Sequence, residues 1–288
     1  MDIVPQLIAN SIVAGAIYTI LVLGFNLTFS VTRFLDIGYG VLITAGGYSA
    51  LYVSRFLGLP FAVGILAGIL ASGLLGFISY KLVYAPLRKR KAGGGVLLIS
   101  SLGVLLFVQA IIAIFFTSQF QSLSGFLASN PTYELWGGTM TWIQLVTLGI
   151  AALLCFAVFF VLRYTMFGKM FTAISDDEEV SKMIGINTEK AMGAIFCVAG
   201  MLAGLGGILI GLDTGVEPAM GLFWLLSIVS TAIIGGIGNV YGGIAGAFFV
   251  AFIENFVIWK IPGQWRLALI FTVLLMFLVW RPKGLFPR

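Results

Sequence analysis

The chain has 288 residues, of which 60% are hydrophobic and only 9% carry a charge. Soluble domains carry about a quarter charged residues, so this composition excludes an ordinary soluble protein and indicates an integral membrane protein. The net charge of +5 indicates basic loops on one side of a membrane rather than nucleic-acid binding. Histidine, the commonest metal ligand, is absent, so we expect no metal site on this chain.

Continuous apolar runs follow one another along the whole chain. Crossing a bilayer takes roughly 20 residues of helix, and these runs lack the alternation of transmembrane strands. We therefore predict one all-α membrane domain, residues 1–288, a polytopic bundle of eight or nine helices. The predicted helices cover 7–30, 37–54, 59–83, 96–117, 142–163, 191–212, 221–236, 241–259 and 265–280. The shortest are candidates for tilted, re-entrant or discontinuous segments.

Basic residues predict the orientation, because cytoplasmic loops are enriched in Lys and Arg. With the N-terminus outside and each helix crossing, only Arg55, Lys260 and Arg266 of the 16 basic residues face outward. The C-terminal tail, with Lys283 and Arg288, is then cytoplasmic, and so is the loop 164–190. The basic run 87–91 is typical of an anchor near anionic lipid headgroups.

Glycines cluster within several predicted helices. The stretches "AGGYSA" and "AGLGGILIG" carry small residues at spacings of three and four, which allow close helix packing in lipid. The stretch "GGIGNVYGG", residues 235–243, is denser, and it predicts a broken helix or tight turn at membrane depth.

The loop 164–190 is the most charged part of the chain and contains the sequence "ISDDEEVSKMIGIN". Ser175 and Glu178 have the spacing of a capping box, and Gly185 is placed as a left-handed helix stop. These signals predict a short helix over 176–184, with the acidic residues, Glu179 among them, in its first turn.

One face of this predicted helix carries Val180, Met183 and Ile184. So short a helix is marginal alone in water, so something must cover this face. Packing against the chain's own membrane domain, or against lipid headgroups, is one reading. Docking into a groove of a cytoplasmic partner is the other. Upstream, the spacing of Phe167, Phe171 and their neighbours predicts a second amphipathic helix, with a close contact or bend at Gly168.

Several polar residues fall within or beside the predicted helices, and each has a structural and a functional reading. A buried amide such as Asn26 usually bonds to a neighbouring helix. Asp36 either caps the helix that follows or pairs with Arg33 to form a gate. An intramembrane carboxylate such as Glu254 bonds a neighbouring helix or lies near the outer interface. The candidates for the translocation pathway are Asn26, Asp36, Tyr39, Asn239, Tyr241 and Glu254.

The stretch "FGKMFTAISDDEEVSKMIGIN" resembles the cytoplasmic coupling loop of ABC-importer permeases, with Val180 and Ser181 in place of two alanines. Two further stretches, residues 24–50 and 232–256, resemble the branched-chain amino-acid permeases, the LivH/LivM group. The chain's length and short tails are similar to those of the LivH-like member. The resemblance implies that Ser175, Glu178, Glu179, Val180, Met183, Ile184 and Gly185 form the element that couples the chain to an ATPase.

The resemblance also implies a multi-pass protein of a prokaryotic cell membrane. Its expected partners are a LivM-like second permease, two cytoplasmic ATP-binding subunits and an extracytoplasmic substrate-binding protein. ATP and magnesium would then bind to the ATPase subunits. This chain would bind no cofactor, and it lacks a phosphate-binding glycine loop. The cargo would be branched-chain or other small hydrophobic amino acids, moved by alternating access.

Three alternatives remain open at the level of sequence. A urea or short-amide permease shares the layout of this family. An ion-coupled secondary transporter would fit the broken, glycine-rich helices, but it has no use for a capped cytoplasmic helix. An intramembrane enzyme would need a catalytic constellation, and the apolar segments contain no paired carboxylates and no Ser/Lys arrangement.

Overall fold

The computed structural model describes residues 3–126, 130–135, 137–260, 262–281 and 284–286, and these fold as a bundle of helices with one small hairpin. Lys283 and Arg288, predicted to be cytoplasmic, lie outside the described residues. Nine helices correspond to the predicted ones: α1 (Ile3–Thr32), α2 (Tyr39–Arg55), α3 (Phe61–Ser79), α5 (Gly94–Phe116), α6 (Trp142–Tyr164), α9 (Thr188–Asp213), α10 (Met220–Gly235), α11 (Val240–Ile258) and α12 (Arg266–Trp280).

The remaining elements are short and lie between these helices. A single π-helical turn, η1 (Tyr80–Tyr84), joins α3 to α4 (Ala85–Lys89), and the charged loop holds α7 (Met166–Asp176) and α8 (Glu178–Met183). Single 3-10 turns, η2 (Ser124–Phe126) and η3 (Gly263–Trp265), precede the hairpin and α12. The hairpin pairs β1 (Thr132–Leu135) with β2 (Gly138–Thr141), Thr132 opposite Thr141, and the sequence pattern did not predict it.

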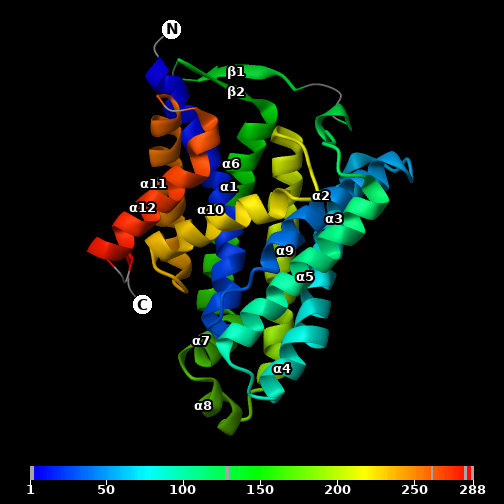
Figure 1. Ribbon diagram of the computed structural model, residues 1–288, viewed down its shortest axis with the longest axis vertical. Helices are drawn as coiled ribbons and strands as arrows, with labels where there is room; N and C mark the ends of the chain where they lie inside the picture. Colours follow the sequence, from blue (N-terminus) through cyan, green and yellow to red (C-terminus); the bar gives the residue numbers. More distant parts are fainter. Residues whose placement is uncertain (1–2, 127–129, 136, 261, 282–283, 287–288) are drawn as a thin grey trace.

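Six helical segments are long and apolar enough to cross a membrane within the described residues: Ile3–Thr32, Phe61–Lys89, Gly94–Phe116, Trp142–Tyr164, Thr188–Asp213 and Val240–Ile258. Three predicted helices, α2, α10 and α12, are shorter, with 17, 16 and 15 residues. In Figure 1, α1, α6 and α9 run along the long axis of the molecule, whereas α10 crosses it. The bundle is therefore polytopic and all-α, with short helices inside it.

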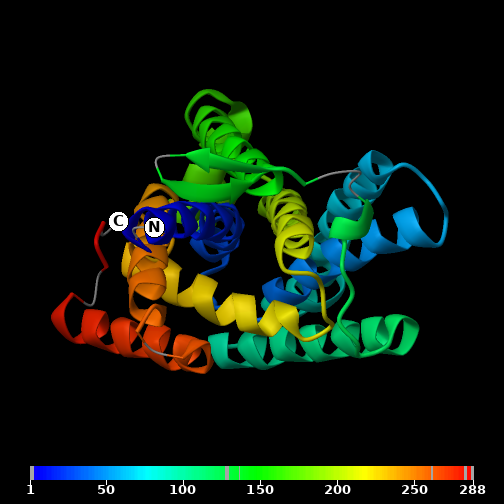
Figure 2. The same cartoon turned by 90° about the horizontal axis from the view of Figure 1, so that it is seen from above.

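The core forms around α1 and α9, which are buried along most of their length. Seen from above, α1 is surrounded by α6, α9, α10 and α11 (Figure 2), and it contacts all four. Helices α3, α5 and α6 leave most of their apolar residues exposed or only partly buried. Such exposed apolar surface on the outer helices is suited to contact with lipid or with other membrane subunits.

Glycine permits the closest approaches between helices, as the sequence predicted. Gly46 on α2 faces the backbone of Gly204 on α9, and a Cβ added at Gly46 would collide with it. The dense glycine stretch is a break between helices, because α10 ends at Gly235 and α11 begins at Val240. Gly236 and Gly238 adopt positive φ angles of 112° and 79° there, a conformation that residues with a Cβ atom rarely adopt.

The molecule has two distinct ends (Figure 1). The start of α1 and the hairpin lie at one end, here named the hairpin end, and α4, α7 and α8 lie together at the other, the α8 end. Gln6 near the start of α1 bonds to Thr139 of the hairpin through both its side-chain oxygen and nitrogen. The charged loop is therefore far from the hairpin, at the opposite end of the long helices.

Candidate functional site

Helix α8 begins at an aspartate cap rather than at the predicted serine. The Asp177 side chain accepts hydrogen bonds from the backbone N–H groups of Glu179, at 2.8 Å, and Val180, at 3.1 Å. Ser175 is instead buried in the last turn of α7, where its hydroxyl donates to the carbonyl of Ser30 on α1 at 3.0 Å. The predicted capping box from Ser175 to Glu178 is wrong, because the amphipathic helix upstream continues to Asp176 and moves the cap two residues on.

The predicted stop at Gly185 is confirmed. Gly185 has a φ angle of 87°, in the left-handed region. Its N–H donates to the carbonyl of Lys182 at 3.1 Å, and the N–H of Ile186 donates to Ser181 at 3.0 Å. This pair of bonds is the Schellman arrangement that satisfies the last carbonyls of a helix. Both ends of α8 are thus fixed by the residues at its boundaries.

The apolar face of α8 points away from the rest of the chain. Val180, Met183 and Ile184 are 52%, 83% and 69% exposed, whereas the small Ser181 on the other side is 2% exposed. Packing of this face against the chain's own membrane domain, one half of the first sequence reading, is therefore wrong. An exposed apolar cluster on a charged helix is a surface for a partner or for the headgroup region of a membrane.

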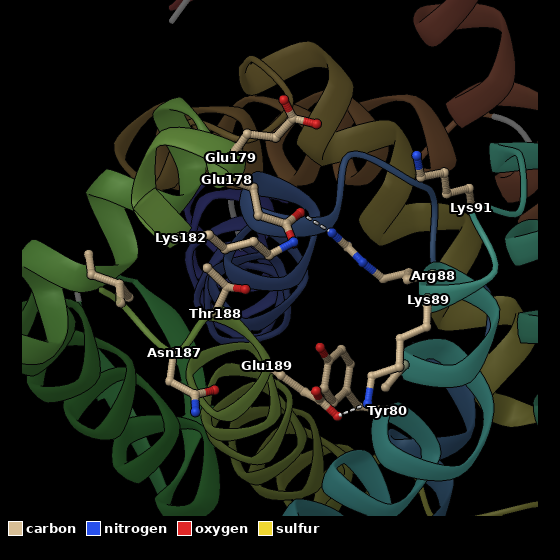
Figure 3. Close-up of a pocket in the computed structure, with 12 residues that line it drawn as sticks. Tyr80, Arg88, Lys89, Lys91, Glu178, Glu179, Lys182, Asn187, Thr188 and Glu189 are labelled. Atoms are coloured by element: carbon tan, nitrogen blue, oxygen red, sulfur yellow. Dashed lines mark hydrogen bonds and ion pairs between the residues drawn. The ribbon is translucent and has the colours of Figure 1, made fainter. Parts of the chain in front are cut away.

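Ion pairs fix the opposite side of α8 to the bundle (Figure 3). The Glu178 carboxylate pairs with Arg88 of α4 and with Lys182 one turn further along α8, the latter at 2.7 Å. A second pair, Lys89 with Glu189 at 2.9 Å, joins α4 to the start of α9. These groups line a cavity of about 670 Å³ between α4, α8 and α9. The basic run, which the sequence predicted to be a lipid anchor, thus supplies two cations that hold protein carboxylates.

Helix α7 is the amphipathic helix that the sequence predicted upstream of α8, and it ties α8 to α1. Phe171 and Ile174 are buried in the core. A Cβ at Gly168 would collide with the backbone of Leu162 on α6, which explains the glycine at this sharp bend. Arg33, at the end of α1, donates to the carbonyl of Ser175 at 2.6 Å. The base of the α8 element is therefore anchored to α1, α4 and α6.

Asn26 and Asn239 meet at the glycine break. The Asn26 side chain donates to the carbonyl of Asn239 at 3.1 Å and accepts from the N–H of Gly238 at 3.3 Å. Asn239 caps α11 by accepting from Tyr241 and Gly242, and its amide donates to the Phe286 carbonyl. The prediction that Asn26 bonds across helices is confirmed, since it satisfies backbone groups that the break would leave unpaired.

Asp36 lies in the connection between α1 and α2 and is 3% exposed. Its carboxylate accepts from the Tyr84 hydroxyl at 2.7 Å and from the backbone N–H groups of Gly38 and Tyr39. It therefore supports the start of α2, but the N-cap of that helix is Gly38, so the predicted cap at Asp36 is wrong. Arg33 bonds to Ser175 instead, and the predicted pair of Asp36 with Arg33 is not formed. Burial raises the pKa of Asp36 to about 6, although these hydrogen bonds oppose the shift.

The other pathway candidates are dispersed. Tyr39 is fully buried, and its hydroxyl donates to the carbonyl of Leu21 at 2.8 Å. Tyr241 is 50% exposed and packs its ring against Phe159. Glu254 is 2% exposed, accepts from Tyr18 of α1 at 2.5 Å and pairs with Arg266 of α12. The structure thus brings Asn26 and Asn239 together and leaves Tyr39, Tyr241 and Glu254 in separate contacts.

Sequence reasoning missed the partners of the buried carboxylates. Arg266 was predicted to be an outer loop charge, and Tyr18 and Tyr84 were not singled out. A carboxylate in an apolar segment needs a hydrogen-bond donor or a cation close by. Glu254 was therefore the signal from which a partner such as Arg266 could have been predicted. Tyr84 had no comparable signal, because its place opposite Asp36 depends on how α3 and η1 pack.

Comparisons with known proteins agree with this architecture. The model of the family described as branched-chain amino acid transport system / permease component matches residues 7–279. The high-affinity branched-chain amino acid transport system permease protein BraD of Pseudomonas aeruginosa is 22% identical over 98% of this chain and 95% of its own length. LivH of Escherichia coli K12 is also 22% identical over the same shares. A probable LivH permease of Methanocaldococcus jannaschii is 24% identical over 88% of this chain and 80% of its own.

Proposed function

Because the chain belongs to the permease-component family of branched-chain amino acid transport systems, we propose that it imports branched-chain or other small hydrophobic amino acids as the LivH-like member of a permease pair. ATP is hydrolysed by partner subunits. The observation that carries the proposal is α8, a capped helix with an exposed apolar face and an ion-paired base.

The geometry of α8 suits the transmission of force. Val180, Met183 and Ile184 offer an apolar surface to a groove on an ATPase subunit. The opposite side is linked through Glu178 to Arg88 on α4, and α7 is linked to α1 through Ser175. A movement of the docked helix would therefore reach two membrane segments at once. Without such links, a short helix on a flexible loop could move without moving the membrane helices.

The charge distribution supports an orientation with the α8 end in the cytoplasm. Basic residues Arg88, Lys89, Arg163 and Lys169 belong to elements at this end, and the hairpin end has the segment 118–141, which lacks Lys and Arg. Under the positive-inside bias, this distribution supports a start of α1 that faces outside. On that side an extracytoplasmic binding protein would deliver cargo.

The proposed partners fit the exposed surface of the bundle. Helices α3, α5 and α6 present broad apolar faces, which suit lipid or a LivM-like second permease. Two ATP-binding subunits would each hold one coupling helix, one from each permease. In alternating access, ATP-driven closure of these subunits moves the coupling helices and opens the passage outward for the amino acid.

The docking role is tested by replacing Val180, Met183 and Ile184 with Asp. A charged face cannot enter an apolar groove, so the ATPase subunits should no longer copurify and uptake into proteoliposomes should cease. The control variant Lys190→Asp adds negative charge at another exposed position of the same loop and should keep both. Copurification and uptake that survive the triple replacement would contradict the proposal and favour a headgroup-bound helix or a secondary carrier.

The cargo is tested separately from the docking. The wild-type complex is reconstituted, and its ATPase rate is measured with binding protein loaded with each of a panel of amino acids or urea. Leucine, isoleucine and valine should stimulate the rate and should be imported. Stimulation by urea alone would replace the proposed cargo with a short amide, while leaving the coupling role of α8 intact.

A further inference from the structure

A small cavity of about 350 Å³ lies between the end of α9, α10 and the start of α12. Cavities of this size, near the lower limit of ligand pockets, hold small molecules. Helices α10 and α12 pack against each other and lie side by side in Figure 2. Arg266, which lines the cavity, reaches Tyr18, a residue halfway along α1. The cavity thus lies beside α1, the central helix of the bundle.

Buried residues fix the position of Arg266, the cation that lines this cavity. The Arg266 guanidinium pairs through Nε with the buried Glu254, and its Nη2 donates to the Tyr18 hydroxyl at 3.0 Å. The Trp224 ring lies under the guanidinium, 5.5 Å from ring centroid to Cζ. Its remaining nitrogen, Nη1, has no protein partner among the described residues. A guanidinium has five N–H donors in a planar fork, so donors remain for a ligand.

A second polar group of the cavity lacks a partner. The Ser227 side chain is 4% exposed and lines the cavity, yet its hydroxyl forms no hydrogen bond within the described part of the chain. Other buried hydroxyls of this helix bond to carbonyls one turn back, as Ser230 does with Leu226 at 2.9 Å. A nearly buried hydroxyl without a partner is costly unless a ligand or water completes it.

Most of the remaining wall is apolar; Gly263 and Thr214, whose hydroxyl already donates to the carbonyl of Ile210, complete it. Phe223, Trp224 and Leu267 line the cavity beside the two polar groups. A site with one cation, one hydroxyl and aromatic or aliphatic walls matches a molecule that carries a carboxylate beside a small apolar group. A neutral amide such as urea would bring no negative charge to the guanidinium, which then has only Glu254 as its counter-charge.

We propose that this cavity is a transient binding site for the amino-acid cargo, with the carboxylate at Arg266 and Ser227 and the apolar side chain against Phe223 and Leu267. This inference rests on the proposed import of amino acids. Glu254 offsets much of the positive charge of Arg266, so the site binds weakly. Weak binding suits a passage, because the cargo must leave again.

Fluorescence of the purified wild-type complex, without binding protein, tests the site directly. Trp224 lies in the cavity wall, so millimolar L-leucine should change the intrinsic fluorescence saturably. Leucinamide, which lacks the carboxylate, should do so at least about tenfold more weakly, as expected for loss of a charge-assisted hydrogen bond. The variant Trp224→Phe assigns the signal among the six tryptophans. Equal responses to both molecules, or a response unchanged in Trp224→Phe, would overturn the proposal.

Transport variants give the second test. The double variant Arg266→Gln, Glu254→Gln removes both charges, so that no buried carboxylate is left unpaired, and Ser227→Ala removes only the hydroxyl. Leucine uptake should fall about tenfold or more in the first and severalfold in the second. ATPase stimulation by loaded binding protein should stay near the wild-type rate, since α8 is untouched. Normal uptake in both variants would refute the site, whereas a wild-type complex that imports no amino acid would refute the proposed function instead.

Discussion

At the scale of single residues, Asp177 determines where α8 begins. It accepts two backbone hydrogen bonds at the first turn, whereas Ser175 bonds to α1. Loss of an N-cap costs about 1 kcal/mol, so Asp177→Ala should speed amide exchange of Glu179 and Val180 about fivefold. Hydrogen exchange followed by mass spectrometry measures this effect on the purified chain.

The serine provides the matched comparison for this prediction. Ser175→Ala removes the hydroxyl bond to Ser30 but leaves the cap of α8 in place. Exchange at Glu179 and Val180 should then stay at the wild-type rate. The opposite pattern, faster exchange in Ser175→Ala only, would restore the capping box that the sequence predicted.

At the scale of elements, two ion pairs join α4 to its neighbours, and they differ in burial. Arg88 and Glu178 are 19% and 26% exposed, whereas Lys89 and Glu189 are 66% and 52% exposed. Exposed pairs contribute little because water screens them. We therefore expect Arg88→Gln to lower the amount of leucine imported per ATP severalfold, and Lys89→Gln to leave this ratio unchanged.

A double-mutant cycle tests whether Arg88 acts through Glu178. If it does, the variant Arg88→Gln, Glu178→Gln should lose no more coupling than the worse single variant, because both remove the same contact. Coupling is read as the ratio of uptake to ATP hydrolysis in proteoliposomes. Additive losses would show that the two residues act independently and that α4 does not receive movement from α8 through this pair.

The positions of the helices could be predicted from the sequence more completely than the contacts between them. Apolar runs placed nine helices, and Gly185, Asn26 and the glycine break were predicted from local chemistry. The ion pair of Arg88 with Glu178 joins residues 90 positions apart, and the bond of Tyr84 with Asp36 joins residues 48 apart. Such pairs depend on how whole helices pack, which local periodicity does not specify. The hairpin was missed because its strands have only four residues each.

At the scale of the whole molecule, the two short helices α2 and α10 meet where their backbones touch. A Cβ added at Gly40 of α2 would lie 2.7 Å from the carbonyl oxygen of Gly221 on α10, and the Gly221 N–H donates to Thr44 at 3.1 Å. The connection that precedes α2 is held by Asp36, Tyr84 and, through Ser101, by α5. This junction therefore links η1, the turn that precedes α4, to α10, which lines the candidate cargo cavity.

Gly40→Ala should push this junction apart. Ala normally favours a helix over Gly by about 1 kcal/mol, but a Cβ forced against a rigid backbone costs about 1–3 kcal/mol. We expect a lower melting temperature of the purified complex and a loss of uptake in this variant. Gly103→Ala, in α5, is the matched control, because a Cβ there meets no atom within 4 Å. It should melt at or slightly above the wild-type temperature. If both variants behaved alike, close approach of α2 and α10 would not be what requires glycine at position 40.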